Sequence, residues 1–269
     1  GDYFLFDGSD STSLMGAYEV FEQSNAIYLL KNQLLKNRED YKVKYFFNKW
    51  FFGTIGDLIL SYDIPEDKWD RIKFTGFNLG YLLPHYKNFT PISKNKPTDL
   101  CAIFSAKHGY SEDHGVRNDI IYSHHREGLW KALSNHKNKY DMITDKLPFE
   151  EYINKMKMSK MSLSPFGQGE ICFRDFEAIQ HGTLLLKPDQ TIVNTYPNIF
   201  IADETYIPLK IDWSDLEEKI DYVLDNFKEI NEKMNNKIRN LFLKKYTYEN
   251  LCSYWYFMFK ELDNVKQNS

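Results

Sequence analysis

The sequence has few cysteines, and they are not arranged as a disulfide framework. Cys101, Cys172 and Cys252 lie far apart in a chain of 269 residues and form no C-x-x-C pair. Small secreted domains carry many paired cysteines, whereas the cytosol keeps thiols reduced. We therefore expect a cytoplasmic protein, either free or peripheral at a membrane, without disulfide bonds.

Long apolar runs and an excess of positive charge are also missing. No apolar run approaches the roughly 20 residues that a membrane-spanning helix needs, and no signal peptide opens the chain. The formal net charge is −4 and the pI about 6.0, so the composition does not favour nucleic acid or an anionic membrane as a partner. The chain begins with Gly-Asp and not with Met, and we expect it to be part of a longer protein.

The composition is that of a globular protein with one large or two modest domains. Hydrophobic residues make up 42% of the chain and charged residues 27%, which is enough apolar material for a core. The stretch 90–97, TPISKNKP, has two prolines and little apolar content, as is typical of a linker. We therefore predict two α/β domains, at residues 1–92 and 98–269, the first of them short for a complete domain.

The most informative stretch, Ser162–Pro188, predicts a strand, a glycine loop, a helix and a second strand. The loop S-P-F-G-Q-G, residues 164–169, cannot continue either regular element because it holds a proline and two glycines. A helix is expected over Ile171–His181, with Gly182 at the position of a C-cap glycine. The apolar run Thr183–Leu186 then predicts a buried strand.

The residue types in this stretch suit a nucleotide diphosphate. Glycines let backbone N–H groups approach a ligand closely, and the helix N-terminus behind them favours an anion. Arg174 and Glu177 are three residues apart, so they share one helix face near that end. A guanidinium binds phosphate in a bidentate manner, and a carboxylate accepts hydrogen bonds from ribose hydroxyls. The alternative is an ordinary strand–loop–helix–strand unit with a surface Arg–Glu pair.

The pattern S-P-x-G-x-G-E-x-x-x-R-x-F-E-A-x-x-x-G is followed by an apolar strand and a proline. It resembles the donor-binding signature of GT-B glycosyltransferases of the group-1-like and exostosin-like bacterial kind. The resemblance covers about thirty residues strongly and the C-terminal part weakly. It implies two Rossmann-like domains facing a cleft and a helical C-terminal tail. It also implies that Gly167, Gly169 and Arg174 contact the diphosphate, that Glu177 binds the ribose, and that Ser164 belongs to the donor site.

Residues before this stretch add candidates for the donor site. Asp99–Ser105 is expected to form the first strand of the second domain, and a polar loop, residues 106–118, follows it. In GT-B enzymes such a loop faces the donor, which makes Ser105 and Lys107 candidate phosphate contacts. Arg126 stands at an expected helix start, where it either reaches the diphosphate or is a surface charge.

A candidate catalytic residue lies near the N-terminus. The apolar run Tyr3–Phe6 predicts a strand that ends at Asp7-Gly8-Ser9-Asp10, and ligands of open α/β sheets lie beyond the carboxyl ends of strands. Asp7 is our candidate general base for an inverting enzyme, with Asp10 as the alternative. The other interpretation is that both aspartates only form the turn, as Asp, Gly and Ser commonly do.

No metal and no other cofactor are expected. His108, His114, His124 and His125 lie close in sequence, but their spacing matches no compact zinc pattern and no cysteine completes it. The chain also has no Asp-x-Asp, the metal–diphosphate motif of GT-A glycosyltransferases. Its absence favours the metal-independent GT-B type, in which basic side chains and helix dipoles stabilise the leaving group.

Periodicity predicts the remaining elements. Residues 13–37 are expected to be mostly helical, and residues 41–47 alternate as a strand does. Pro148 is expected to open an amphipathic helix, and residues 198–201 a short strand. Ser214–Glu217 has the pattern of a capping box, which would start the first of three C-terminal helices. The last of these is expected to pack back toward the first domain, as in GT-B enzymes.

Together these features predict transfer of a sugar from a nucleotide-sugar donor to a carbohydrate acceptor, in the synthesis of a surface polysaccharide. Two alternatives stay open: a GT-B-fold nucleotide-sugar epimerase or hydrolase, similar to the UDP-sugar 2-epimerases, and a non-catalytic glycan-binding domain. Nucleic-acid binding is the least favoured function, because the chain has an acidic balance and no basic stripe with spaced aromatic residues.

Overall fold

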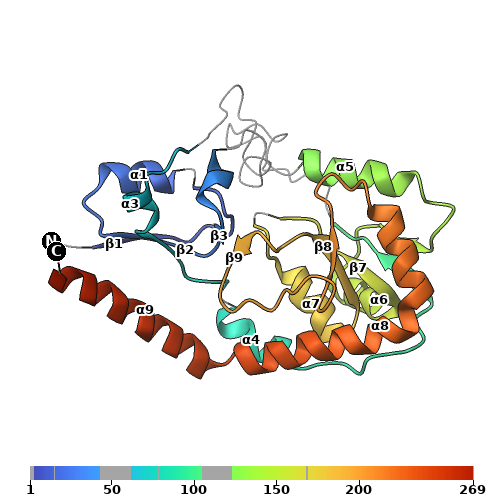
Figure 1. Cartoon of the computed structure of the whole chain (residues 1–269). Coiled ribbons are helices and arrows are strands. Elements are labelled where there is room, and N and C mark those ends of the chain that lie inside the picture. Colours follow the sequence, from blue (N-terminus) through green and yellow to red (C-terminus); the bar gives the residue numbers. More distant parts are fainter. Residues whose placement is uncertain are drawn as a thin grey trace.

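The computed structural model describes residues 3–14, 16–42, 62–77, 79–104, 123–167 and 169–268. The structure is mixed α/β, with two parallel sheets and a helical C-terminal segment (Figure 1). The N-terminal part holds a three-stranded sheet and the central part a five-stranded one. Within these ranges, no helix combines the length and the apolar character needed to cross a bilayer.

The first sheet has the strand order β1–β2–β4, and its strands run parallel. The elements of this part are β1 (Phe4–Asp7), α1 (Ala17–Gln23), β2 (Tyr28–Lys31), β3 (Leu34–Leu35), the 3-10 helix η1 (Arg38–Tyr41), α3 (Glu66–Trp69) and β4 (Ile72–Phe74). The middle strand β2 reads Tyr-Leu-Leu-Lys, and all four of its side chains are buried. A strand covered on both faces has no polar face, so its apolar residues follow one another without alternation.

The second sheet has the order β10–β8–β7–β5–β6 and is also parallel. The strands predicted around the glycine loop are its neighbouring strands β7 and β8. The elements of this part are η2 (Gly80–Leu82), α4 (Leu83–Tyr86), β5 (Thr98–Cys101), α5 (Ser123–Ser134), β6 (Met142–Ile143), α6 (Phe149–Met158), β7 (Ser159–Leu163), α7 (Phe173–His181), β8 (Leu184–Pro188), β9 (Val193–Asn194) and β10 (Ile207–Leu209). Strand β9 also pairs with β3 of the first part in an antiparallel ribbon.

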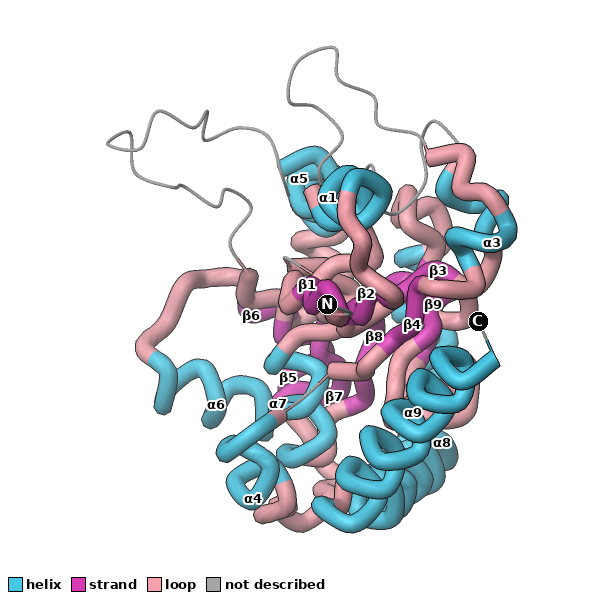
Figure 2. Tube along the Cα trace, turned by 90° about the vertical axis from the view of Figure 1, so that its left-hand side faces the viewer, coloured by secondary structure: helices cyan, strands magenta, loops and turns pink. Residues whose placement is uncertain are grey.

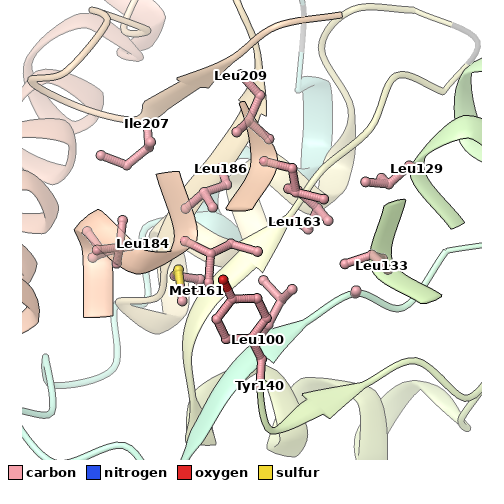
Figure 3. Close-up of a cluster of buried hydrophobic side chains, with 14 of the residues drawn as sticks. Leu100, Leu129, Leu133, Tyr140, Met161, Leu163, Leu184, Leu186, Ile207 and Leu209 are labelled. Carbon is pink, nitrogen blue, oxygen red and sulfur yellow. The ribbon is translucent and has the colours of Figure 1, made fainter. Parts of the chain in front are cut away.

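Helices cover both faces of the second sheet. Figure 3 shows one face, where two leucines of α5 pack near Leu100, Met161 and Leu186 of the strands. The first half of α8 (Leu216–Lys245) completes this cluster. On the other face, α4, α6 and α7 gather on one side of the strands (Figure 2), with Phe176 of α7 inside a group of aromatic rings. The loop between β7 and α7 is therefore attached to elements that are packed on both sides.

The C-terminal helices connect the two parts of the molecule. Helix α9 (Tyr248–Asn268) follows α8 and runs back beside the first sheet (Figure 1). Its residues Met258 and Leu262 pack against Tyr28 and Leu30 of β2. The prediction that the final helix returns to the first domain is confirmed.

The prediction of helix over residues 13–37 is wrong. Helix α1 covers only seven residues and ends at Gln23, with Ser24 as its C-cap. The Ser24 hydroxyl donates to the carbonyl of Phe21 and accepts from the N–H of Ala26. Such local hydrogen bonds of a serine side chain compete with helix continuation. The leucines that suggested a longer helix lie in strands β2 and β3.

Four smaller predictions need correction or lie outside the described residues. The two helices expected between residues 216 and 242 are one helix of 30 residues, α8. No capping box starts it: the N-cap is Asp215 and not Ser214, and the Asp215 carboxylate accepts from the N–H of Lys210 and caps no N–H of the helix. Residues 198–201 form no strand. Of the strand expected over 41–47, only residues 41 and 42 are described, and Tyr41 ends η1.

The predicted linker, residues 90–97, packs along the helices of the second part. The N–H of Thr90 donates to the carbonyl of Gln180, and the Asn231 side chain donates to the carbonyl of Ser93. Helix α4, which precedes this stretch, belongs to the same apolar cluster as α7. The domain boundary at residues 92 to 98 stays a prediction.

Candidate functional site

A buried carboxylate organises the loop between β7 and α7. Asp175, in the first turn of α7, accepts hydrogen bonds from Ser164 Oγ (2.6 Å) and from the N–H of Cys172 (3.1 Å). It also forms an ion pair with Lys187 of β8, with 2.5 Å between Nζ and Oδ2 and no exposed surface on either side chain. Lys187 donates in turn to the carbonyl of Glu170 (3.0 Å). These contacts place Ser164, a predicted donor contact, inside the loop, where its hydroxyl holds the helix start.

Gly169 allows the loop to touch the segment that follows β1. A Cβ atom at this residue would lie 1.9 Å from the carbonyl oxygen of Asp10, so the close approach requires glycine. Beside it, the buried Glu170 carboxylate accepts from the N–H (3.0 Å) and the hydroxyl (2.7 Å) of Thr12. The glycine loop and the segment after Asp7 are therefore in direct contact.

Arg126 lies against the glycine loop. Its Nε donates to the carbonyl of Phe166 at 2.8 Å, and the residue is only 4% exposed. A Cβ atom on Gly167 would lie 3.4 Å from Arg126 Nη2, so the glycine backbone and the guanidinium are neighbours. Of the two interpretations left open by the sequence, the surface charge is wrong, because the side chain is buried. A contact with diphosphate stays a prediction.

A pocket of about 440 Å³ opens at the N-terminal end of α7. It is lined by Ile103, Arg126, Leu147, Phe149, Tyr152, Cys172, Phe173, Arg174 and Glu177. Most of these residues are apolar or aromatic, with a few polar groups among them, which is the usual composition of small-molecule sites. The fold thus brings three predicted donor residues, Arg126, Arg174 and Glu177, to one pocket, although they come from two helices.

Arg174 has no hydrogen-bond or ion-pair partner among the described residues. It is half-buried in the pocket wall, and its Nε is buried without an acceptor. A guanidinium carries five N–H donors, and a buried donor left unpaired costs about 1–3 kcal/mol. Arg174 also lies in the first turn of α7, where the helix dipole favours negative charge. Both features suit an anionic ligand.

Glu177, on the same face of α7, accepts a hydrogen bond from the hydroxyl of Tyr152 on α6. The distance between Tyr152 Oη and Glu177 Oε2 is 2.7 Å. Burial raises the pKa of Glu177 above that of an ordinary glutamate, although this hydrogen bond and the charge of Arg174 act in the opposite direction. Burial and the nearby carboxylate also raise the pKa of Tyr152, so the phenol keeps its proton. Among the described residues, no donor reaches the second oxygen, Oε1.

Asp7 ends β1 as predicted, but its carboxylate is engaged. It accepts from the N–H of Ser9 (2.9 Å) and forms an ion pair with Lys31 of β2, whose side chain is fully buried. Burial raises the pKa of Asp7, but Lys31 and Ser9 outweigh it, and the net result is a lowered pKa. Asp7 does not line the pocket. The contact with Ser9 fits the turn-forming interpretation, and the role of general base stays a prediction.

Two predicted phosphate contacts, Ser105 and Lys107, lie outside the described residues. In the part of the chain that the structure describes, no three His, Cys, Asp or Glu side chains are placed to hold a metal ion. The independence from metal stays a prediction.

Sequence reasoning missed two interactions of the site. Tyr152 follows the apolar spacing of α6, so the sequence marks it only as a packing residue. Nothing local shows that its hydroxyl meets Glu177. The contact between Thr12 and Glu170 joins residues 158 positions apart, and no sequence signal could have paired them.

No protein-family model matches the chain, and no curated protein matches it by sequence. Similar solved structures include TarM, with 9% identity and a TM-score of 0.49 over 95% of this chain and 50% of that one. A glycosyltransferase from Rickettsia africae ESF-5 gives 13% identity and a TM-score of 0.48 over 97% and 76% of the two chains. The pneumococcal O-GlcNAc transferase GtfA, in complex with UDP and GlcNAc, gives 13% and 0.45 over 96% and 52%. This chain thus spans about half the length of TarM and of GtfA.

Proposed function

We propose that this chain is a metal-independent glycosyltransferase of the GT-B type. It moves a sugar from a nucleotide-sugar donor to a carbohydrate acceptor, in the synthesis of a surface polysaccharide. The observation that carries the proposal is the pocket at the start of α7, where the guanidinium of Arg174, unpaired within the described residues, and the carboxylate of Glu177 share one helix face. A ligand with an anionic group next to a hydroxyl-bearing ring satisfies both side chains.

Arg174 and Arg126 bind the diphosphate of the donor. Negative charge grows on the diphosphate as its bond to the sugar breaks. Guanidinium groups and a helix N-terminus that are already in place stabilise this charge without reorganising during the reaction. Removal of one such donor typically lowers kcat by about 10²–10³-fold, and we expect a loss of this size for Arg174→Ala. Gly167, whose backbone lies beside Arg126, contacts the diphosphate as well.

Glu177 binds the ribose of the donor. Its Oε1 accepts a hydrogen bond from a ribose hydroxyl, while Oε2 stays bonded to Tyr152. A carboxylate serves this purpose only while it is ionised, because a protonated carboxyl offers fewer acceptor positions. Since the pKa of Glu177 is raised, this carboxylate is protonated at a higher pH than an exposed glutamate. As the pH is lowered, donor affinity is therefore expected to fall earlier than it would with an exposed glutamate.

The segment after β1 forms the acceptor side. Gly169 and Glu170 hold this segment against the glycine loop. In an inverting reaction, Asp7 takes the proton of the acceptor hydroxyl. The acceptor oxygen then bonds to the anomeric carbon of the donor sugar as the bond between that carbon and the diphosphate breaks. In a retaining reaction Asp7 has no such role. Asp7→Asn separates the two cases, because loss of transfer with unchanged donor binding supports the base.

A thermal-shift panel tests the site. UDP, GDP, CMP, ADP and dTDP are added to the wild type, to Arg174→Ala and to Arg38→Ala, a partly exposed arginine in η1 outside the pocket that serves as the control. A ligand that binds only the folded state raises the melting temperature by mass action. We expect one nucleotide to stabilise the wild type and Arg38→Ala but not Arg174→Ala. No shift at millimolar nucleotide would contradict the proposal.

Incubation of a nucleotide-sugar with and without acceptors then separates transfer from the other reactions. A transferase forms a glycosylated acceptor. An epimerase or hydrolase instead releases nucleotide with a changed or free sugar when no acceptor is present, and that product would overturn the proposed reaction while leaving the nucleotide site intact.

A further inference from the structure

We infer that Tyr152 is a positioning residue whose hydroxyl holds the Glu177 carboxylate in one orientation, with one oxygen left open for the ribose of the donor. This inference rests on the proposed function. The two residues come from different helices, α6 and α7, which pack against each other on the same side of the second sheet (Figure 2). Both line the pocket.

The hydrogen bond restricts a side chain that would otherwise be free to move. A glutamate has several rotatable bonds, and fixing a long polar side chain costs about 0.5–1.5 kcal/mol of free energy at the moment of binding. Tyr152 fixes it in advance, because Oε2 is occupied at 2.7 Å while Oε1 has no partner in the described part of the chain. The Tyr152 ring also lies near that of Phe149 in a tilted arrangement, with 6.2 Å between ring centroids.

The charges around Glu177 make the role of Tyr152 measurable. The titratable and charged groups that act on this carboxylate or are acted on by it come from four elements: Tyr152 of α6, Arg174 and Asp175 of α7, His85 and Tyr86 of α4, and Cys101 of β5. Burial and Asp175 raise the pKa of Glu177, whereas the Tyr152 hydrogen bond, Arg174 and His85 lower it. Loss of the Tyr152 hydroxyl therefore raises this pKa further, and the ionised form is lost at a higher pH.

Tyr152→Phe tests the inference, with Tyr140→Phe as its matched control. Tyr140 makes the same kind of bond, to Asp221 at 2.7 Å, between residues that do not line the pocket. Affinity for the nucleoside diphosphate that gives the largest thermal shift is measured by calorimetry from pH 4.5 to pH 8. We expect Tyr152→Phe to weaken nucleotide binding about fivefold at pH 7.5. We also expect the acid limb, the part of the affinity–pH curve where affinity falls as the pH is lowered, to move up by about one pH unit. Tyr140→Phe changes neither value.

Inorganic pyrophosphate serves as a second probe, because it engages Arg174 but has no ribose. Its affinity is expected to be the same in the wild type and in Tyr152→Phe. If pyrophosphate and the nucleotide weaken equally and the acid limb does not move, Tyr152 only supports the pocket and the inference is overturned. The fall of affinity at low pH must also persist in His85→Gln, since its disappearance there would show that it does not report on Glu177 and would overturn the inference.

Failure of the inference and failure of the proposed function give different results. If the nucleotide binds in an Arg174-dependent manner and Tyr152→Phe behaves as the wild type, the positioning role alone is rejected. If no nucleotide binds the wild type at any pH, both are rejected.

Discussion

An alanine at residue 169 should force apart the two segments that meet at the site, whereas an alanine at residue 167 should not. The Cβ atom of Gly169→Ala would lie 1.9 Å from the carbonyl oxygen of Asp10 and 2.5 Å from its carbonyl carbon. Non-bonded atoms are at equilibrium about 3.5–4.0 Å apart, so the backbone of one segment must move by about 1.5 Å or more. Neither Gly169 nor Gly167 has a positive φ, and the predicted effect therefore comes from the contact alone.

The expected cost follows from overpacking. Inserted methyl groups that displace backbone typically cost about 1–3 kcal/mol, and each kcal/mol lowers the Tm of a chain of this size by about 2–4 °C. Gly169→Ala should therefore melt roughly 2–12 °C below the wild type. At Gly167 the added methyl group would meet Arg126 Nη2 at 3.4 Å, the end of a side chain that can adjust. The added methyl group makes an ordinary contact there, so its effect should be clearly smaller than that of Gly169→Ala.

Urea unfolding, monitored by tryptophan fluorescence, measures the free energy of unfolding of Gly169→Ala and of Gly167→Ala. The comparison is internally controlled, because both substitutions add one methyl group to the same loop. Equal stabilities of Gly169→Ala and the wild type would refute the close approach of the two segments. A loss in Gly167→Ala as large as that in Gly169→Ala would show that the loop tolerates no added group at all, so that the contact with Asp10 is not the cause of the destabilisation.

Three further predictions concern the buried and paired charges around the site. Lys187→Met leaves the Asp175 carboxylate buried without its partner and should cost about 3–5 kcal/mol of unfolding free energy; the double variant with Asp175→Asn should recover part of it, and no recovery would contradict the pairing. Thr12→Val removes the hydroxyl donor to buried Glu170 and should cost about 1–3 kcal/mol, while Thr12→Ser stays near the wild type; equal losses would mean that the hydroxyl contributes nothing. The lowered pKa of Asp7 means that its stabilisation is complete above the unfolded-state pKa of about 3.9 and is lost as the pH falls through the lower native value. Asp7→Asn should therefore flatten the stability–pH curve below about pH 4, and an unchanged slope would rule out the ion pair as its cause.

The sequence could predict the features that depend on neighbouring residues. Gly182 ends α7 in the left-handed conformation, with φ 60° and ψ 42°, because a residue without Cβ takes that shape at no steric cost. Pro148 stands directly before α6, because proline has no N–H to donate and is tolerated at the start of a helix but not inside it. The strand–loop–helix–strand unit around the glycine loop was predictable in the same way, with the helix beginning at Phe173 and not at Ile171.

Tertiary contacts explain what the sequence could not predict. Leu30 and Leu34 are four residues apart, a spacing that suits a helix, yet they belong to strands on either side of a bend. In that bend, Gln33 donates through its side chain to the carbonyl of Asp10 at 2.6 Å, a partner 23 residues away. The pairs Thr12–Glu170 and Tyr152–Glu177 likewise exist only because the fold brings distant segments together.

The most direct test of the central claim is calorimetric titration of the best-shifting nucleoside diphosphate and of its 2′-deoxy analogue into the wild type, Arg174→Ala and Glu177→Gln. We expect Arg174→Ala to weaken both ligands at least tenfold, because the diphosphate loses a charged partner. Glu177→Gln should weaken the ribonucleotide more than the deoxy analogue. Wild-type affinity in both variants would contradict a nucleotide-sugar site at the start of α7.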